Sequence, residues 1–104
     1  MLLVKYIFLM KRISFSNERG MNLHQLKILL AIAKHRSFTK AAQELHLSQP
    51  ALSLHMKELE EEYGVDLFDR LGRSITLTEA GKVVEDSAVR LLALIREMEE
   101  ALAD

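Results

Sequence analysis

The stretch FTKAAQELHLSQPALSLHMK at residues 38–57 predicts two short helices joined by a tight turn. Small side chains at Ala41 and Ala42 let a second helix approach the first closely, and Leu52 and Met56 point back onto it. The polar residues of the second helix then fall on a single outward face. This layout is typical of a helix-turn-helix that presents its second helix to the major groove of DNA, with an ordinary helical hairpin as the alternative.

The second predicted helix has a clear beginning and a regular buried stripe. Ser48 is a natural helix cap, and Pro50 is tolerated because the first turn has no intrahelical N–H bonds to lose. Ser37 is the corresponding cap of the preceding helix. The expected buried stripe contains Leu52, Met56, Leu59 and Tyr63.

Two further elements are expected around this unit. Residues 23–35 predict a helix that closes the core, and residues 65–77 predict a small β-hairpin, or wing, in which Gly72 permits the turn. The core side of the helix is expected to contain Leu23, Leu26, Leu29, Leu30 and Ala33. The apolar strand positions of the wing are Leu67, Phe68, Ile75 and Leu77.

The last predicted helix, capped by Thr78 and continuing to about Ala103, is longer than the rest of the domain can cover. Its roughly 25 residues span about 38 Å at about 1.5 Å per residue. Apolar residues recur along it at alternating spacings of four and three, which suits packing on another helix. We call this stripe the seam; it contains Val84, Ala88, Leu91, Ile95, Met98 and Leu102.

The composition excludes several classes of function. With no Cys among 104 residues, disulfide frameworks, thiolate zinc sites and cysteine nucleophiles are absent, which is compatible with a reducing cytoplasm. The four His residues lack the spacing of metal ligands; they are His24, His35, His46 and His55. No nucleophile–base set, Gly-rich phosphate loop or paired carboxylate site is recognisable, so we expect neither an enzyme nor a cofactor or metal.

The net charge of −1 conceals a segregation of charge along the chain. Residues 34–57 carry four basic residues and one acidic residue, whereas residues 58–69 carry six acidic residues and no basic one. The position of charges, more than their total, decides the field at a DNA groove. We expect the acidic run Glu58, Glu60, Glu61 and Glu62 to be a solvated helix face that points away from DNA.

The first twenty residues, MLLVKYIFLMKRISFSNERG, stand apart from the rest. Most of their positive charge follows the apolar run, which is the wrong order for a secretory signal, and the run is too short to span a membrane. A membrane-surface anchor is one interpretation. Our preferred hypothesis is that translation begins at Met21, in which case the intact mass of protein made from the native gene would lack residues 1–20.

The order of motifs strongly resembles the DNA-binding domain of LysR-type transcriptional regulators. The pieces that carry the resemblance are SFTKAA at 37–42, LSQPALS at 47–53, LEEEYGVDLFDR at 59–70 and LTEAG at 77–81. The resemblance covers residues 21–104 and implies a mainly α fold, a winged helix-turn-helix followed by a long dimerisation helix. We therefore expect an N-terminal extension at 1–20, a DNA-binding domain at 21–78 and a linker helix at 79–104.

The resemblance also implies where DNA is contacted. Thr39 and Lys40 are candidates for phosphate contact, with capping or solvation as the alternative. Arg70 either supports the wing or touches a phosphate, while Arg73 is expected to enter the minor groove. The full predicted DNA-contacting set is Thr39, Lys40, Ser48, Gln49, Pro50, Ala51, Ser53, Leu54, Lys57, Arg70, Arg73 and Ser74.

One position departs from the family pattern. Leu54 and His55 follow Ser53 where the family very often has Arg and Gln, so a guanine contact is expected to be lost. Leu54 either packs against thymine methyl groups, which favours an A·T-rich half-site, or is an ordinary exposed Leu.

The predicted function is sequence-specific binding of double-stranded DNA for transcription regulation in the cytoplasm, at the nucleoid. In the family the linker helix pairs two chains, so the seam implies a homodimer on an inverted repeat. The alternative is a truncated regulator that heterodimerises with a full-length relative. We expect no membrane partner and no small-molecule effector site in this chain.

Overall fold

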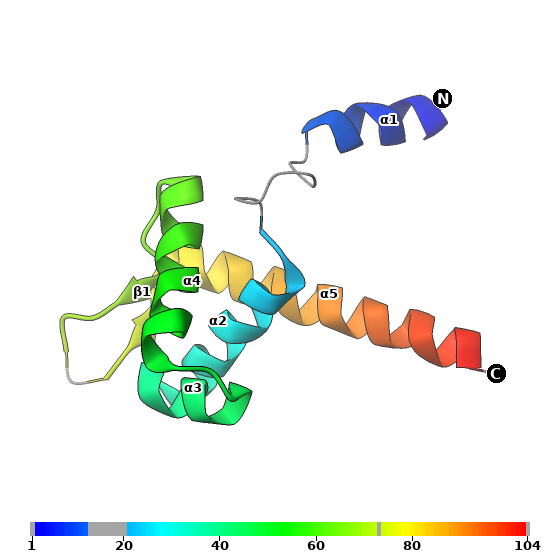
Figure 1. The fold of residues 1–104 in the computed structure, drawn as a ribbon. Coiled ribbons are helices and arrows are strands. Elements are labelled where there is room, and N and C mark those ends of the chain that lie inside the picture. Colours follow the sequence, from blue (N-terminus) through cyan, green and yellow to red (C-terminus); the bar gives the residue numbers. More distant parts are fainter. Residues whose placement is uncertain (1, 13–20, 73, 104) are drawn as a thin grey trace.

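The helix-turn-helix forms where the sequence predicts it. The computed structural model describes residues 2–12, 21–72 and 74–103, and within them α3 (Phe38–Leu45) and α4 (Gln49–Tyr63) are joined by a short turn (Figure 1). Ser37 caps α3 by accepting a hydrogen bond from the Lys40 backbone N–H at 3.1 Å. Ser48 caps α4 by accepting one from the Ala51 N–H at 3.2 Å. Both predicted caps are therefore confirmed.

A left-handed residue makes the turn between these helices tight. His46 ends α3 with φ of 56°, and the following Leu47 N–H donates to the Ala42 carbonyl at 2.9 Å. Such a C-cap satisfies carbonyls that the end of the helix leaves unpaired. The turn therefore sets the direction in which α4 leaves α3.

Helix α2 (Leu23–His35) packs against α3, α4 and α5. Asn22 and Gln25 form a capping box, in which the Asn22 side chain accepts from the Gln25 N–H at 2.8 Å and the Gln25 side chain accepts from the Asn22 N–H at 3.1 Å. The buried apolar side of α2 consists of Leu26, Ile28, Leu29, Ala31 and Ile32. The expected core position of Leu23 is wrong, because its side chain lies exposed one residue after the cap.

The core continues through α4 and the base of the wing. Leu52, Met56 and Leu59 are buried as predicted, but Tyr63 is exposed because α4 ends at this residue and runs beyond its neighbours. Phe38 and Phe68 meet edge to face, with their ring centroids 5.5 Å apart. This contact joins the first turn of α3 to the wing.

The wing is a two-stranded antiparallel sheet of β1 (Phe68–Asp69) and β2 (Thr76–Leu77), in which Phe68 pairs with Leu77 and Asp69 with Thr76. The predicted hairpin is confirmed, although its strands are short. Leu67 and Ile75 lie just outside the strands and still pack on the core.

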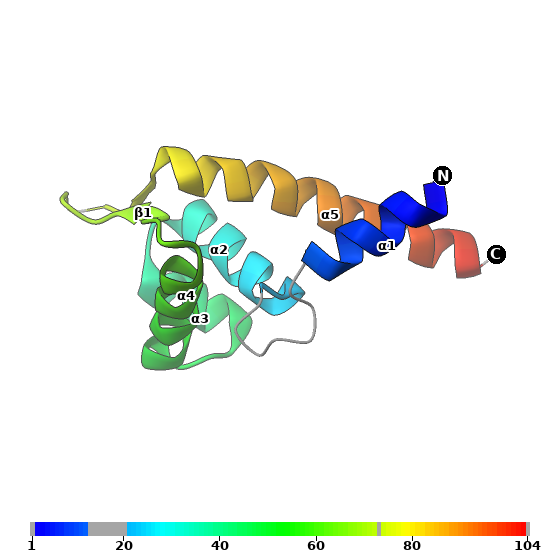
Figure 2. The same cartoon turned by 90° about the horizontal axis from the view of Figure 1, so that it is seen from above.

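Helix α5 (Glu79–Ala103) begins tightly against the wing. Thr78 accepts a hydrogen bond from the Gly81 N–H at 3.0 Å and donates its hydroxyl to the Asp66 carbonyl at 2.6 Å, which confirms the predicted cap. At Gly81 an added Cβ would lie 2.2 Å from the Leu67 carbonyl oxygen. Only glycine therefore allows this close approach. Beyond its first half, α5 projects past the other helices of the domain (Figures 1 and 2).

Helix α1 (Leu2–Arg12) stands away from the domain (Figure 1). The view from above shows it on the side toward the end of α5 and far from the wing (Figure 2). Within the described residues, no helix combines the length and apolar character needed to cross a membrane.

Candidate nucleic-acid interface

The exposed side of α4 carries most of the predicted base-reading residues. Gln49, Pro50, Leu54 and Lys57 are exposed, and Ser53 is partly exposed between them. These residues belong to the first half of α4, whose opposite side is anchored in the core. The core thus holds this mixed polar and apolar face of α4 toward solvent. Ser48 and Ala51 lie at the beginning of the same helix.

A hydrogen bond orients Gln49 within this face. Its Nε2 donates to the Ser53 hydroxyl oxygen at 2.8 Å, across one helical turn. The amide still has its carbonyl oxygen and a second N–H available, because a Gln side chain offers two donors and one acceptor group. The sequence pointed to both residues separately but not to their mutual contact.

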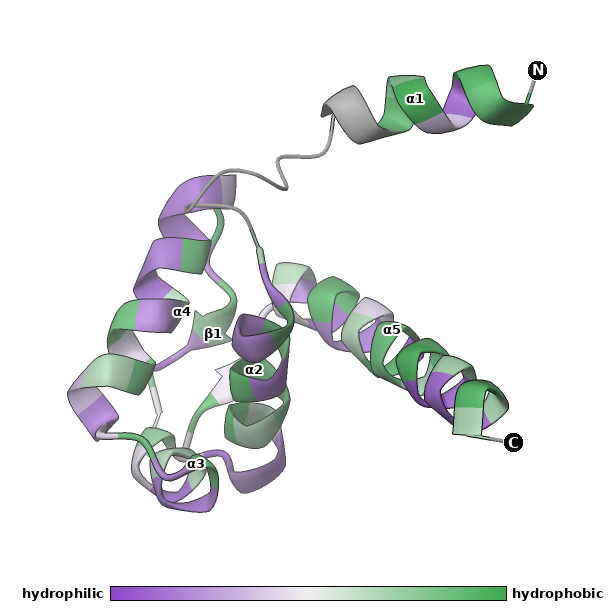
Figure 3. Ribbon diagram, turned by 45° about the vertical axis from the view of Figure 1, so that its right-hand side comes forward, coloured by the Kyte–Doolittle hydropathy of each residue, from purple (hydrophilic) through white to green (hydrophobic). Residues whose placement is uncertain are grey.

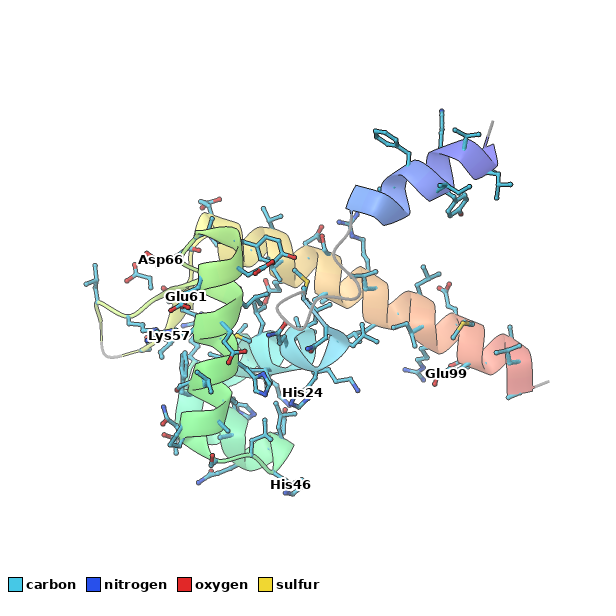
Figure 4. The ribbon with its side chains drawn as sticks, turned by 45° about the horizontal axis from the view of Figure 1, so that its top comes forward. His24, His46, Lys57, Glu61, Asp66 and Glu99 are labelled. Carbon is cyan, nitrogen blue, oxygen red and sulfur yellow. The ribbon has the colours of Figure 1, made fainter. Side chains whose placement is uncertain are left out.

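Lys57 is the single Lys or Arg of α4 and stands directly before its acidic run. Figure 4 shows Lys57 and Glu61 on the wing side of α4, with Asp66 beyond them. One helical turn therefore separates a candidate phosphate contact from an acidic side chain. The prediction that the whole acidic run is solvated is wrong for Glu60, whose side chain is partly buried and bonded to the wing.

Glu60 and Arg70 connect α4 to the wing. The Glu60 carboxylate accepts the Leu67 backbone N–H at 2.8 Å, and its other oxygen lies 3.5 Å from a guanidinium nitrogen of Arg70. The guanidinium carbon of Arg70 also lies 4.8 Å from the centroid of the Phe38 ring. These contacts favour the wing-support interpretation of Arg70, and DNA contact by Arg70 stays a prediction.

Two other wing residues were predicted to contact DNA. Ser74 is exposed next to the tip of the wing. Arg73 lies outside the described residues, so its predicted position in the minor groove stays a prediction.

The start of α3 presents Thr39 and Lys40 to solvent. The backbone N–H of Lys40 is used by the Ser37 cap, so only its side chain is available for a phosphate. Nearby, Lys34 of α2 donates to Glu44 of α3 at 2.8 Å. The charge of Lys34, which the sequence count included, is therefore neutralised by an ion pair within the same chain.

Glu44 has a second partner in this cluster. A ring nitrogen of His35 lies 3.2 Å from the same carboxylate oxygen that Lys34 contacts. The hydrogen bond from Lys34, and after it the one with His35, holds the pKa of Glu44 below its ordinary value of 4.5. The cluster ties α2 to α3 behind the candidate DNA face.

The histidines have other surroundings. His55 of α4 meets His24 of α2 edge to face, with 5.1 Å between ring centroids. Spacing along the chain could not predict this pair, because the two residues are far apart in sequence. Among the described residues, no three His, Cys, Asp or Glu side chains gather closely enough to hold a metal ion.

The predicted seam of α5 divides into covered and free parts. Ala88 is fully buried within its own chain and exposes no surface for a partner, while Val84 is half-buried against the core. Leu91, Met98 and Leu102 are exposed and Ile95 is half-buried. The surface available to another chain thus begins near Leu91.

An apolar groove adjoins this free surface. It has a volume of about 450 Å³ and lies between the start of α2, the end of α4 and the first half of α5. Its lining includes Met21, Leu26, Tyr63, Val65, Val83 and Leu91.

A winged helix-turn-helix with an exposed reading face on α4 defines the class of DNA-binding regulatory domains. Residues 23–82 match the model of the bacterial regulatory helix-turn-helix proteins of the LysR family. The chain belongs to this family. It forms a LysR-family DNA-binding domain, which serves transcription regulation.

Relatives and solved structures agree with this assignment. The chain is 49% identical over 81 residues to a RuBisCO operon transcriptional regulator of Allochromatium vinosum, which covers 78% of this chain and 27% of the relative. It is 43% identical over 86 residues to the transcriptional activator CmpR of Synechocystis, covering 83% of this chain and 28% of that protein. The chain thus spans little more than a quarter of these relatives.

Several of the similar solved structures are complexes with DNA. The BenM DBD in complex with benA site 1 DNA has a TM-score of 0.76 at 35% identity, covering 80% of this chain and 93% of that chain. The CbnR DBD–DNA complex has a TM-score of 0.72 at 38% identity, covering 80% of this chain and 97% of that one.

Proposed function

We propose that this chain reads double-stranded DNA sequence-specifically as a homodimer on an inverted-repeat site, and so regulates transcription. The observation that carries the proposal is the pairing of two exposed surfaces on one rigid domain. One is the Gln49, Ser53 and Leu54 face of α4, and the other is the free apolar part of α5. Because the target is chromosomal DNA, the proposal also implies a cytoplasmic location.

Base reading begins with Gln49. The hydrogen bond to Ser53 holds the amide in one orientation, with its carbonyl oxygen and one N–H free. An amide in this state can pair bidentately with adenine in the major groove, a contact worth roughly 1–3 kcal/mol of discrimination. Ser53 is thus a positioning residue for Gln49.

Leu54 contributes an apolar contact in the same groove. Its side chain is 55% exposed beside Ser53, on a face that is otherwise polar. Thymine offers a methyl group in the major groove, which an aliphatic side chain can cover. We therefore propose an A·T-leaning half-site.

Phosphate contacts come from the edges of the face. Thr39 and Lys40 at the start of α3, and Lys57 on α4, are exposed and flank the reading residues. Lysine side chains at such positions set the register of a protein on DNA without reading sequence. In this proposal Arg70 acts mainly by holding the wing against α4.

The second chain is proposed to bind through α5. Leu91, Met98 and Leu102 lie exposed on a helix that extends past its own domain, next to the groove at Val83. An apolar helix face of this length is normally covered by another helix. Two chains related by a two-fold axis would then read two inverted half-sites.

Selection of bound sequences from a random double-stranded DNA pool tests the proposal. The full chain is used near physiological salt, and the mass of each bound complex is recorded. Enrichment of an A·T-leaning inverted repeat bound by two chains is the expected result. Salt-sensitive binding without enrichment would contradict specific reading and would favour heterodimerisation with a full-length relative as the function of α5.

A further inference from the structure

Helix α1 is apolar around most of its circumference. From Leu2 to Leu9 every residue except Lys5 is a large apolar side chain, and all of these residues are exposed. Helices that are apolar on all sides are normally buried. Because the family match begins at residue 23, the assigned DNA-binding domain does not account for α1.

The end of α5 offers an apolar flank beside the seam. Leu94, Glu97 and Ala101 are exposed and follow each other at spacings of three and four, so they share one side of the helix. Leu94 is 61% exposed and does not belong to the seam. Figure 3 shows apolar residues along the outer length of both α5 and α1.

The charges of the two helices are complementary. Helix α1 contains Lys5, Lys11 and Arg12 and no acidic residue. In the last part of α5, Arg96 is paired with Glu100 at 2.9 Å, and Glu97 on the flank has no ion pair among the described residues. A basic apolar helix and an acidic apolar flank therefore occur on the same chain.

We propose that α1 of one chain packs against the Leu94, Glu97 and Ala101 flank of α5 in a second copy. The inference rests on the proposed dimer, in which a second α5 would be available to each α1. In the single chain α1 does not lie along the end of its own α5, from which it is separate in Figure 1. The eight residues between Arg12 and Met21 can reach about 27 Å when extended.

The register of the contact follows from spacing along α1. Leu2, Tyr6 and Leu9 fall on one side of the helix, and Lys5 stands beside them. Packing this side on Leu94 would bring Lys5 toward Glu97.

A lipid surface would match the charge of α1 but would leave the acidic apolar flank of α5 uncovered, so a second copy is the better fit.

Disulfide cross-linking tests the contact, because the chain has no Cys of its own. One full-length protein carries Leu9→Cys and a second, distinguishable by mass, carries Leu94→Cys. On mild oxidation of the mixture we expect the mixed disulfide to form preferentially. The matched control replaces the second protein with Val89→Cys, which is similarly exposed at 54% but lies on another side of α5.

A charge exchange supplies a second readout. Lys5→Glu is expected to slow the cross-link by about two- to fivefold, in line with an exposed ion pair. Combining it with Glu97→Lys should restore the rate. The proposal would be overturned by a cross-link that forms equally with Val89→Cys, or by a cross-linking rate that is the same with and without the charge changes.

The remaining outcomes separate this proposal from the dimer itself. Leu91→Glu on the seam should abolish both the dimer and the cross-link. If the proteins without Leu91→Glu are dimeric but form no mixed disulfide, only the α1 contact is overturned. A disulfide confined within one chain carrying both Cys substitutions would assign α1 to its own α5 instead. Binding to phosphatidylserine vesicles that is lost with Lys5→Glu, or a native product whose intact mass begins at Met21, would also overturn it.

Discussion

In the proposed DNA complex, Leu54 decides what kind of base contact this part of α4 can make. In place of a long cation, the exposed side of α4 carries an aliphatic side chain next to the oriented Gln49. An aliphatic residue cannot hydrogen-bond a guanine edge but can cover a thymine methyl group. Specificity at this position thus depends on a methyl group.

Replacing thymine by uracil removes only that methyl group from the site. We expect each contacted uracil to weaken binding about fourfold, because burying one such group is worth ~0.8 kcal/mol. Leu54→Ala should bind both sites equally, as measured by fluorescence anisotropy titration. Leu71→Ala, a change at a 97% exposed position in the wing loop, should keep the discrimination; equal thymine and uracil affinities in the unaltered protein would contradict the methyl contact.

Gly81 controls how closely α5 approaches the wing. A Cβ at this position would meet the Leu67 carbonyl at 2.2 Å, and a backbone atom cannot move aside as a side-chain end can. Gly81→Ala is expected to lower the free energy of unfolding by about 1–3 kcal/mol in urea denaturation. Gly72→Ala, whose Cβ would have only a Ser74 backbone oxygen at 3.9 Å, should be nearly neutral. Equal effects of the two changes would disprove this explanation.

At the scale of elements, Glu60 makes α4 and the wing one unit. It accepts the Leu67 N–H and lies near Arg70, whose guanidinium packs over Phe38 of α3. Three elements that are separate in sequence therefore depend on one carboxylate. These contacts hold the wing to α4 without any contribution from the short strands of the wing.

Glu60→Gln keeps an acceptor but removes the charge. We expect faster hydrogen exchange of the Leu67 amide and a loss of about 1 kcal/mol in stability, the size of one charge-assisted hydrogen bond weakened to a neutral one. Glu61→Gln, at an exposed position next to it, should change neither measurement. Unchanged exchange at Leu67 in Glu60→Gln would show that the wing is held by packing alone.

The contact between α2 and α3 should depend on pH through Glu44. Its pKa is lowered in the folded chain by Lys34 and His35, so the unfolded chain binds the proton more readily. The stabilisation is therefore present above the ordinary pKa of 4.5 and is lost as pH falls through the folded-state pKa. Glu44→Gln should flatten the decline of unfolding free energy as pH falls below 4.5, while Glu62→Gln should not.

For the whole molecule, the proposed dimer depends on the free part of α5, because two DNA-binding domains can act together only if two chains pair. Leu91→Glu places a charge where the free part of the proposed seam begins, and we expect the dimer dissociation constant to rise at least tenfold, a loss of about 1.4 kcal/mol or more. Sedimentation velocity measures the dimer dissociation constant. Binding of the variant to an inverted repeat should weaken, while its binding to a single half-site should persist. Val89→Glu on another side of α5 is the control; a dimer that survives Leu91→Glu would place the interface elsewhere.

The sequence by itself determined the local features of this protein. The caps at Ser37, Ser48 and Thr78, the turn at His46 and Leu47, and the apolar stripe of α4 all arise from contacts within a few residues along the chain. Such contacts are encoded by residue type and spacing alone. The family assignment follows from the same motifs, since they occur together and in order.

Only the tertiary structure decided which surfaces are free. Burial depends on which neighbour covers a face, and that neighbour is distant in sequence: Ala88 is fully buried on a helix that packs against α2, the wing engages Glu60, and Tyr63 at the end of α4 stays 54% exposed. The same holds for Arg70, whose partners come from α3 and α4. Periodicity shows that a helix has an apolar side, but packing decides how much of that side is left for another molecule.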